Sequence, residues 1–566
     1  MQRRGFIQSL AIGAGVITTN SLYGISPENS LEFSGIQKLS APVLVAGGGL
    51  GGVAAALALL RNGEKVILTE ETDWIGGQLT SQAVPPDEHS WIETHGAPVS
   101  YRVFRDRVRA FYKENYPLVE TQLNNPFLNP GNGSVSRLCH EPKVAVSVLE
   151  RMLYPYVSSG QLTLLLNHKP ISSEVSGNSV RTVTFRNVLT TKTLQIDSSF
   201  FIDATELGDL LPLTGTEYVK GTESKQETGE LHAPEFADPQ NQQAFTTCFV
   251  LEHLEGEDFV QKPKNYNFWA NYTPAIQPAW SGKLLDLTYS YPKTLKPKRL
   301  GFDPTGNDTS GLLNLWNYRK LIDRNNFKPG FYKGDISLIN WPQNDYMLGN
   351  LIDVSEKAFK SHVESSKDLG RALLYWLQTE APRTDGKKGW PGLRLRPDIM
   401  GTEDGFAKYP YIRESRRIKA EFTVTELHVG KDNRVKVAGS NEDGTVAAYF
   451  KDSVGVGYYH IDLHPTTKVN YIDFSSLRFQ IPLGALLPIR MDNIFPANKN
   501  IGTTHITNGC YRLHPVEWSI GEAVALLIVF AKDKRVSPKE VRKNENLLKE
   551  FQKFLHDQGV ETEWKD

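Results

Sequence analysis

The best candidates for acid–base chemistry lie close together near the C-terminal end of the chain. His505 and His514 are candidate general bases, because an unperturbed histidine titrates near neutral pH. Tyr511 and Arg512 lie between them and could bind a substrate or stabilise a developing oxyanion. A helix is predicted after Pro515, and the positive end of its dipole would stabilise negative charge in front of it. A structural role for each of the four residues remains the alternative.

A glycine-rich turn near the N-terminus is typical of a site for the cofactor that such residues would serve. Gly47, Gly49 and Gly52 match G-x-G-x-x-G, and Gly51 adds a fourth glycine. In this pattern the first glycine allows a tight turn, the second lets a pyrophosphate approach the backbone, and the third permits close helix packing. The helix predicted over residues 53–60 would direct its N-terminal N–H groups at the phosphates. The turn therefore predicts a dinucleotide site.

Two predicted strands frame this turn. Residues 42–46 form a short apolar run before the turn, and residues 65–69 form a second run after the helix. Glu70 ends the second run, about 20 residues after the turn, where an acid can accept hydrogen bonds from ribose hydroxyls. Glycine-rich turns also occur in ordinary strand–helix connections. The order of strand, turn, helix, strand and acid favours the dinucleotide site over that alternative.

Further segments resemble the bacterial FAD-dependent oxidoreductase family of exported flavoproteins, which is distantly related to the fumarate reductase flavoproteins. The resemblance extends over most of residues 41–530. Glu206 and Asn498 stand where that family usually has glycine. The segments that carry the resemblance are Gly47 to Gly52, Gly76-Gly77-Gln78, Glu141-Pro142, Asp203-Ala204-Thr205, Arg413 to Arg417, Arg512 to Pro515, and Gly521-Glu522-Ala523.

The resemblance implies that the chain binds FAD and catalyses a redox reaction. It does not give the substrate. In this family type the segment that follows the acid wraps the flavin side of the cofactor. The residues implied as FAD-binding are Gly47, Gly49, Gly51, Gly52, Glu70, Gly77, Gln78, Leu79, Asp203, Ala204, Thr205, Asn500, Gly521 and Glu522.

The predicted fold class is α/β: a Rossmann-like FAD-binding domain, with a parallel sheet and a β-meander, and an inserted α+β substrate domain. A targeting segment and linker would occupy residues 1–40. The FAD-binding domain would comprise residues 41–215 and, with strands of the substrate domain, 396–535. The aromatic-rich region 216–395 would form the substrate domain, and residues 536–566 a C-terminal helix.

Other predicted elements follow from the pattern of apolar residues. In the substrate domain we expect two helices, and in the C-terminal part mainly strands followed by two helices. The predicted elements are strands at 193–196 and 200–205, helices at 354–366 and 369–379, strands that follow residue 418 as far as about 481, a last parallel strand at 494–497, a loop at 498–509, and helices at 515–530 and 538–558.

The composition excludes several classes of function. The net charge of −1 gives no electrostatic basis for binding nucleic acid. The three cysteines contain no C-x-x-C pair, which removes the dithiol flavin reductases. No zinc-ligand spacing occurs among the 13 histidines, so no metal is expected. No transmembrane span is expected in the mature protein.

The N-terminus predicts export. Arg3 and Arg4 are followed by Phe6 and a mildly apolar run over residues 10–16, which resembles a twin-arginine signal. That route carries folded proteins, so a cofactor inserted in the cytoplasm could travel with the chain. We therefore expect a periplasmic or secreted protein. A frayed basic N-terminus is the alternative.

The predicted function is oxidation of a small hydroxylated or amine-bearing substrate by hydride transfer to FAD, as in a dehydrogenase or oxidase. The electrons would pass to oxygen, a quinone or a redox protein. The absence of a second G-x-G-x-x-G makes a separate NAD(P)H domain improbable. One alternative is an FAD-dependent monooxygenase that uses external NAD(P)H. The other is a secreted flavin- or glycan-binding protein without turnover.

Overall fold

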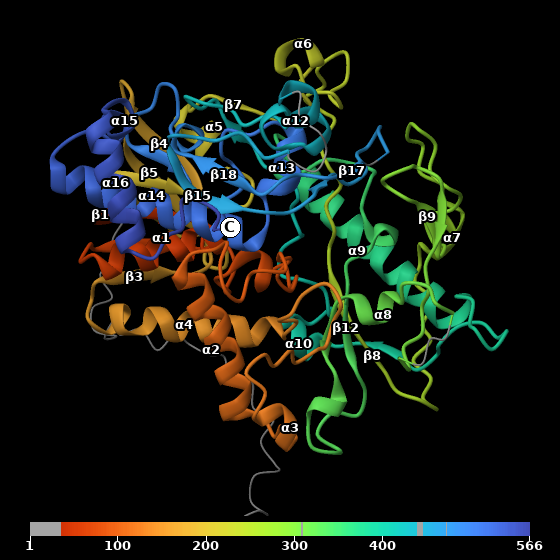
Figure 1. Cartoon of the computed structure of the whole chain (residues 1–566). Coiled ribbons are helices and arrows are strands. Elements are labelled where there is room, and N and C mark those ends of the chain that lie inside the picture. Colours follow the sequence, from red (N-terminus) through yellow and green to blue (C-terminus); the bar gives the residue numbers. More distant parts are fainter. Residues whose placement is uncertain (1–35, 307–309, 439–444, 471, 566) are drawn as a thin grey trace, which may run out of the picture. The chain divides into compact units, whose positions relative to one another are not determined.

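The computed structural model describes residues 36–306, 310–438, 445–470 and 472–565 of the chain. Residues 38–566 form one compact unit. The predicted export signal lies outside the described residues. In Figure 1 the early elements, in red and orange, and the late elements, in blue, lie together around helices α1 (Leu50–Arg61) and α14 (His514–Lys534). The middle of the chain, in green, lies beside them.

The largest sheet has seven strands in the order β3-β2-β1-β6-β5-β4, and β19 pairs with β6 outside that path. The pairs β1–β2, β2–β3 and β6–β19 are parallel, whereas β4, β5 and β6 form an antiparallel meander. This arrangement confirms the predicted fold class. The strands are β1 (Gln37–Ala46), β2 (Val66–Thr69), β3 (Leu162–Leu165), β4 (His168–Ser176), β5 (Ser179–Asn187), β6 (Thr193–Asp203) and β19 (Ile494–Pro496).

Strand β6 replaces the two short strands that the sequence predicted at 193–196 and 200–205. Its first half pairs with β5, and its second half pairs with β19, so one strand serves both parts of the sheet. No glycine or proline interrupts Thr193–Asp203, and the chain therefore has no reason to bend between the halves. The predicted division was wrong because each half was interpreted by itself.

Helix α14 is the central helix of the core. Among the described residues it is the only helix long and apolar enough to cross a membrane, and 94% of its apolar window is buried inside the protein. It packs against α1, and a Cβ atom built on Gly521 would lie 1.9 Å from the backbone oxygen of Gly51. Helices α2 (Val99–Asn115) and α4 (Pro142–Ser158) pack against each other nearby.

A second sheet, antiparallel, lies in the middle of the chain. Its order is β11-β12-β8-β13, and a separate hydrophobic core covers it. Helix α9 (Glu356–Thr379) is one helix where the sequence predicted two, because no proline interrupts it near residue 367. The strands are β8 (Phe249–His253), β11 (Lys320–Ile322), β12 (Ile336–Ile339) and β13 (Leu393–Leu395).

The C-terminal part departs most from the predicted elements. Two helices, α11 (Glu426–Val429) and α12 (Lys431–Ala438), interrupt the region predicted as strands. Helix α13 (His505–Tyr511) replaces part of the predicted loop, because the Thr504 side chain caps its first turn. The predicted last helix is two helices, since Asn544 ends α15 (Pro538–Lys543) and caps α16 (Glu545–Asp557).

The remaining elements are short and connect the two sheets. They are helices α3 (Glu120–Leu123), α5 (Leu210–Thr214), α6 (Lys225–Thr228), α7 (Tyr266–Asn271), α8 (Leu315–Tyr318) and α10 (Pro397–Met400), 3-10 turns Gly77–Leu79, Arg324–Asn326, Pro342–Asn344 and Leu483–Leu486, and strands β7 (Tyr218–Val219), β9 (Thr288–Ser290), β10 (Pro297–Arg299), β14 (Arg417–Ile418), β15 (Ser453–Gly457), β16 (Ile461–Asp462), β17 (Asp473–Phe474) and β18 (Phe479–Pro482).

Candidate functional site

The glycine turn joins β1 to α1 and is packed too closely for side chains. Gly47 has φ +94°, and a Cβ atom there would lie 2.3 Å from the Ala204 oxygen. A Cβ atom on Gly51 would lie 1.5 Å from the Ala497 oxygen, and one on Gly52 would lie 2.1 Å from the Gly47 oxygen. The glycines therefore let the turn cross the ends of β6 and β19, and they leave backbone N–H groups at the start of α1.

Two buried carboxyl groups flank the turn. Glu70, at the end of β2, accepts hydrogen bonds from the backbone N–H of Gly48 at 2.8 Å and of Thr72 at 2.9 Å. Asp203, at the end of β6, accepts bonds from the Thr205 N–H and hydroxyl and from the Leu210 N–H. Burial raises the pKa of each carboxyl group to about 7. Glu70 thus lies where the sequence placed a ribose-binding acid.

The turn Gly77–Leu79 and the start of α14 close the same region. Gln78 donates to the backbone oxygen of Arg512 at 2.9 Å, and Lys499 is fully buried between Glu206 and Glu517, at 2.6 and 3.2 Å. Asn500 donates to the Asp203 backbone oxygen.

Unpartnered buried atoms suit the site to a polar ligand. Gln78 Oε1, Glu206 Oε1 and His514 Nε2 are buried and have no hydrogen-bond partner among the described residues. Buried polar atoms are normally hydrogen-bonded, so these atoms and the glycine cradle fit a bound dinucleotide. The open volume between Gly47, Glu70, Gly77 and Glu206 is only about 20 Å³, so binding requires Glu206 and its neighbours to move.

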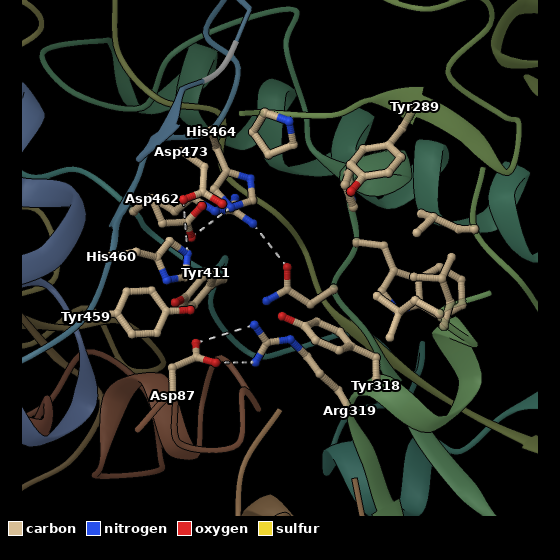
Figure 2. A pocket seen from close by; sticks show the side chains of 18 of the residues that line it. Asp87, Tyr289, Tyr318, Arg319, Tyr411, Tyr459, His460, Asp462, His464 and Asp473 are labelled. Atoms are coloured by element: carbon tan, nitrogen blue, oxygen red, sulfur yellow. Dashed lines mark hydrogen bonds and ion pairs between the residues drawn. The ribbon is translucent and has the colours of Figure 1, made fainter. Parts of the chain in front are cut away.

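A larger cavity of about 190 Å³ lies beside this region (Figure 2). Asp87 and Arg512 line it, and both connect it to the dinucleotide region: the Asp87 N–H donates to His514 Nδ1 at 3.0 Å, and the Arg512 oxygen accepts from Gln78. The cavity is lined by Asp87, Tyr289, Pro292, Leu300, Leu313, Leu315, Tyr318, Arg319, Asn340, Trp341, Pro342, Tyr411, Arg413, Tyr459, His460, Asp462, His464, Asp473 and Arg512.

His464 belongs to a buried chain of charged groups. Its Nδ1 lies 2.6 Å from Asp345 Oδ2, and the other Asp345 oxygen is 2.9 Å from Arg413 and accepts a bond from Thr246. Burial acts to raise the pKa of Asp345, but Arg413 and His464 outweigh it and lower that pKa. An ionised Asp345 can accept a hydrogen bond from Nδ1–H, which fixes the orientation of the His464 ring. Nε2 lies 3.5 Å from Asp462.

Two further ion pairs form the cavity wall. Asp87 pairs with Arg319 at 3.1 Å, and Figure 2 shows the two side chains facing each other. Asp462 pairs with Arg512 at 3.0 Å, and Arg512 also donates to the Tyr411 hydroxyl. Burial opposes ionisation of Asp462, yet His464 and Arg512 hold its pKa well below its usual range.

The structure places the four predicted catalytic residues differently. Arg512 lines the cavity. His514 lies behind Asp87, and burial lowers its pKa to about 3. His505 is 2.9 Å from Glu414 and lines a second cavity of about 110 Å³, whose wall also includes His464. Tyr511 is buried, and its hydroxyl donates to the Gln480 oxygen.

Most of the predicted FAD-binding residues lie around the glycine turn, but not all of them do. Twelve of them lie in the turn, the strand ends or the segments that close the dinucleotide region. Leu79 is buried in the core beside that region. Glu522 points elsewhere, since its carboxylate oxygens bind Arg61 and the Ser100 hydroxyl. Their roles towards the cofactor stay predictions.

The sequence did contain a signal for the cavity that was missed. His460, Asp462 and His464 alternate in the segment around β16 (Ile461–Asp462), and side chains at i, i+2 and i+4 of an extended segment share one face. Asp87 and Arg319 have no such signal, because their segments are brought together only by folding. In the described part of the chain no group of three or more His, Cys, Asp or Glu side chains is arranged to hold a metal ion.

Comparison with known proteins gave one match of long extent. A family model described as FAD dependent oxidoreductase matches residues 42–555. No curated protein matches the chain.

The similar solved structures are distant. An L-proline dehydrogenase from P. horikoshii is 15% identical, covers 33% of this chain and 25% of its own, and has a TM-score of 0.18. A glycerol-3-phosphate dehydrogenase from Bacillus halodurans complexed with FAD is 13% identical, with coverages of 38% and 40% and a TM-score of 0.22. The flavin-dependent monooxygenase PieE is 12% identical, with coverages of 68% and 52% and a TM-score of 0.26. The chain thus spans a quarter to about half of their lengths, and at these TM-scores the similarity carries no information on its reaction.

Proposed function

The chain belongs to the FAD dependent oxidoreductase family and has FAD as its cofactor, and from this we propose that it oxidises a small hydroxylated or amine-bearing compound in the 190 Å³ cavity. The observation that carries the proposal is the buried chain Arg413–Asp345–His464 at the cavity wall. Such a chain holds a histidine in one tautomer and orientation, as a general base requires.

The bound FAD would supply the redox chemistry, by accepting a hydride from the substrate carbon. The protein would take the remaining proton. In our proposal His464 Nε2 removes it from the substrate O–H or N–H as the C–H bond breaks, which leaves a carbonyl or imine product. Asp345 stabilises the imidazolium that forms, and Arg413 keeps Asp345 ionised. Tyr411 and Arg512 would orient the substrate heteroatom.

We further propose that the electrons pass from the cofactor to oxygen, a quinone or a redox protein. The cavity lies next to the N-terminus of α14, whose dipole favours the negative charge of a reduced cofactor.

A visible spectrum of the holoprotein tests this function. The protein is mixed without oxygen with pools of sugars, polyols, amines and hydroxy acids. We expect the flavin absorbance to bleach with one pool, and bleaching to slow about 100-fold in a His464→Asn variant that still binds FAD. Bleaching by NADPH alone would favour a monooxygenase. Ligand binding without bleaching would indicate a protein without turnover, and equal rates in the variant would remove His464 from the mechanism.

We also propose that the chain is exported, because Arg3 and Arg4 with the following apolar run resemble a twin-arginine signal. Expression in a bacterial host that has this route would test it. We expect holoprotein in the periplasmic fraction, and retention in the cytoplasm when both arginines are replaced by lysine. Equal export of the variant would contradict the proposal.

A further inference from the structure

The charges that line the cavity cancel one another. Each of its three arginines is already paired with an aspartate: Arg319 with Asp87 at 3.1 Å, Arg413 with Asp345 at 2.9 Å, and Arg512 with Asp462 at 3.0 Å. A carboxylate or phosphate substrate would therefore meet no arginine without its own counter-ion. Because the desolvation of an unpaired charge is costly, this wall disfavours acidic substrates.

The remaining carboxyl group of the wall, Asp473, ionises less readily than an exposed aspartate. Among the described residues, Asp473 pairs with no arginine, and His460 lies 3.8 Å from it. Burial raises the pKa of Asp473, and the opposing effect of His460 does not cancel that shift, to which Asp462 adds. A carboxyl group with a raised pKa attracts an ammonium ion less strongly than a carboxylate with an ordinary pKa. It can still accept a hydrogen bond from a hydroxyl group. The wall thus disfavours amines as well.

Several polar atoms of the wall lack a hydrogen-bond partner. Apart from the indole N–H of Trp341, four of those that lack a partner among the described residues are N–H donors and one is a carboxyl oxygen, and all belong to residues that line the cavity. A hydroxyl group can accept a hydrogen bond from an N–H donor and donate one to a carboxyl oxygen. Neighbouring hydroxyl groups on one ligand therefore match these unpartnered atoms. The atoms are Nε of Arg319, Arg413 and Arg512, Nδ2 of Asn340, and Oδ1 of Asp473.

Part of the cavity lining is apolar. Leu300, Leu313, Leu315 and Trp341 line the cavity from one stretch of the middle region. Figure 2 shows Tyr289 across the cavity from the group that holds His464. An apolar and aromatic wall that faces a hydrogen-bonding wall suits a ring with C–H faces and hydroxyl edges.

The size of the cavity limits the ligand to one ring. A cavity of about 150 Å³ holds a single six-membered carbon ring. The volume of about 190 Å³ therefore accommodates one such ring with its substituents.

From these observations we propose that the cavity binds one neutral, polyhydroxylated six-membered ring, such as a hexose-sized sugar or a cyclitol, in preference to amines and acids. The inference rests on the proposed function for its reaction. One ring carbon would lose its C–H hydride to FAD and its O–H proton to His464, which gives a ring ketone or lactone. The binding itself is independent of that reaction.

Isothermal titration calorimetry of the holoprotein at pH 7 tests the preference. The panel contains glucose, galactose, mannose and myo-inositol as neutral rings, glucosamine as an amine and glucuronate as an acid. We expect at least one neutral ring to bind at least tenfold more tightly than both charged rings. A methyl glycoside and a disaccharide show whether a free ring or the end of a glycan is bound.

An Asp462→Asn variant sharpens the test, because it leaves Arg512 without its counter-ion. We expect the affinity for glucuronate to rise about tenfold and that for the best neutral ring to fall. The matched control is Asp492→Asn, which removes an exposed partner of Lys539 and changes neither affinity. If the first variant does not fold, the panel on the natural protein decides alone.

The outcomes separate this inference from the proposed function. A neutral ring that binds and bleaches the flavin supports both. A neutral ring that binds without bleaching supports the ligand class and removes the redox proposal. Bleaching by the amine or the acid, with no neutral ring bound, overturns the ligand class and keeps the redox proposal. No binding by any neutral ring overturns the inference.

Discussion

Around the glycine turn, burial raises the pKa of Glu70 and Asp203 to about 7, whereas beside the cavity the pKa values of Asp345 and Asp462 lie below their usual range. All four carboxyl groups are buried in the protein. The difference is the cationic partners of the cavity, because His464 and an arginine face each of its two aspartates. Backbone N–H and hydroxyl groups alone do not hold Glu70 and Asp203 ionised. One region is thus defined by close backbone packing and the other by paired charges.

The largest expected effect comes from breaking the packing of the turn. In Gly51→Ala the new methyl group would lie 1.5 Å from the Ala497 oxygen, and the backbone on both sides would have to separate. We expect the variant to purify without FAD, or not to fold. The measurement is the ratio of flavin to protein absorbance. Gly177→Asn is the control, because its exposed turn has φ +60° and open space. A Gly51→Ala variant with a full complement of FAD would contradict this account.

The second prediction compares the two regions by pH. The pKa of Glu70 is about 7 in the folded apoprotein and near 4.5 when unfolded, so the folded form binds more protons between these values. The contribution of the Glu70 carboxyl group to the free energy of unfolding is therefore greatest at low pH, and it is lost as the pH rises through 7. The natural protein and Glu70→Gln are compared by urea unfolding at pH 5 and pH 8. Relative to the natural protein, the unfolding free energy of the variant should be about 2 kcal/mol higher at pH 8 than at pH 5.

The control for this comparison is Glu414→Gln, next to Arg413. Burial opposes its ionisation, but His505 and Arg417 lower the pKa of Glu414 to about 2. The carboxyl group is ionised in both states above pH 5, so in a His505→Gln background, which removes the imidazole that pairs with it, its replacement should cost the same free energy at pH 5 and 8. An equal pH response of both variants would show that the two regions do not differ.

The third prediction breaks the charged chain of the cavity. Asp345→Asn removes the anion that orients His464 and faces Arg413. We expect turnover of the best substrate to fall about 100-fold, while its binding changes little and FAD stays bound. Stopped-flow reduction and calorimetry give the two quantities. Asp385→Asn, in an exposed pair with Arg383, should change neither. Unchanged turnover in Asp345→Asn would leave the chain a structural role only.

The smallest effect is expected at Glu522. Its carboxylate binds Arg61 and Ser100 rather than the glycine turn, so Glu522→Gln should lower stability by roughly 2 kcal/mol and leave the FAD content unchanged. Urea unfolding and the flavin absorbance ratio measure both. Loss of FAD with unchanged stability would instead support the cofactor role that the resemblance implied.

The sequence predicted the turn region well because its determinants are local. Gly47 to Gly52 and Glu70 follow one another within a single strand–helix–strand unit, and their pattern needs no knowledge of the rest of the fold. The single strand β6 was missed because its two halves have different partners, β5 and β19. The pairing of β6 with β19 depends on a segment hundreds of residues away in the chain.

The cavity was predicted poorly for the same reason. Asp87 pairs with Arg319, and Asp345 with His464, across long separations in the chain. Only the alternation of His460, Asp462 and His464 was visible locally, and it marks a shared strand face rather than a reaction. Arg512 was the one predicted catalytic residue that lines the cavity.

The contact between Gly51 and Gly521 has a consequence for how the protein is made. The first helix can complete its packing only when α14 and β19 are present, and both belong to the end of the chain. During synthesis the glycine turn leaves the ribosome long before these elements. Cofactor capture therefore has to wait until translation is nearly finished, and a ribosome-bound chain stalled before residue 490 would hold no flavin.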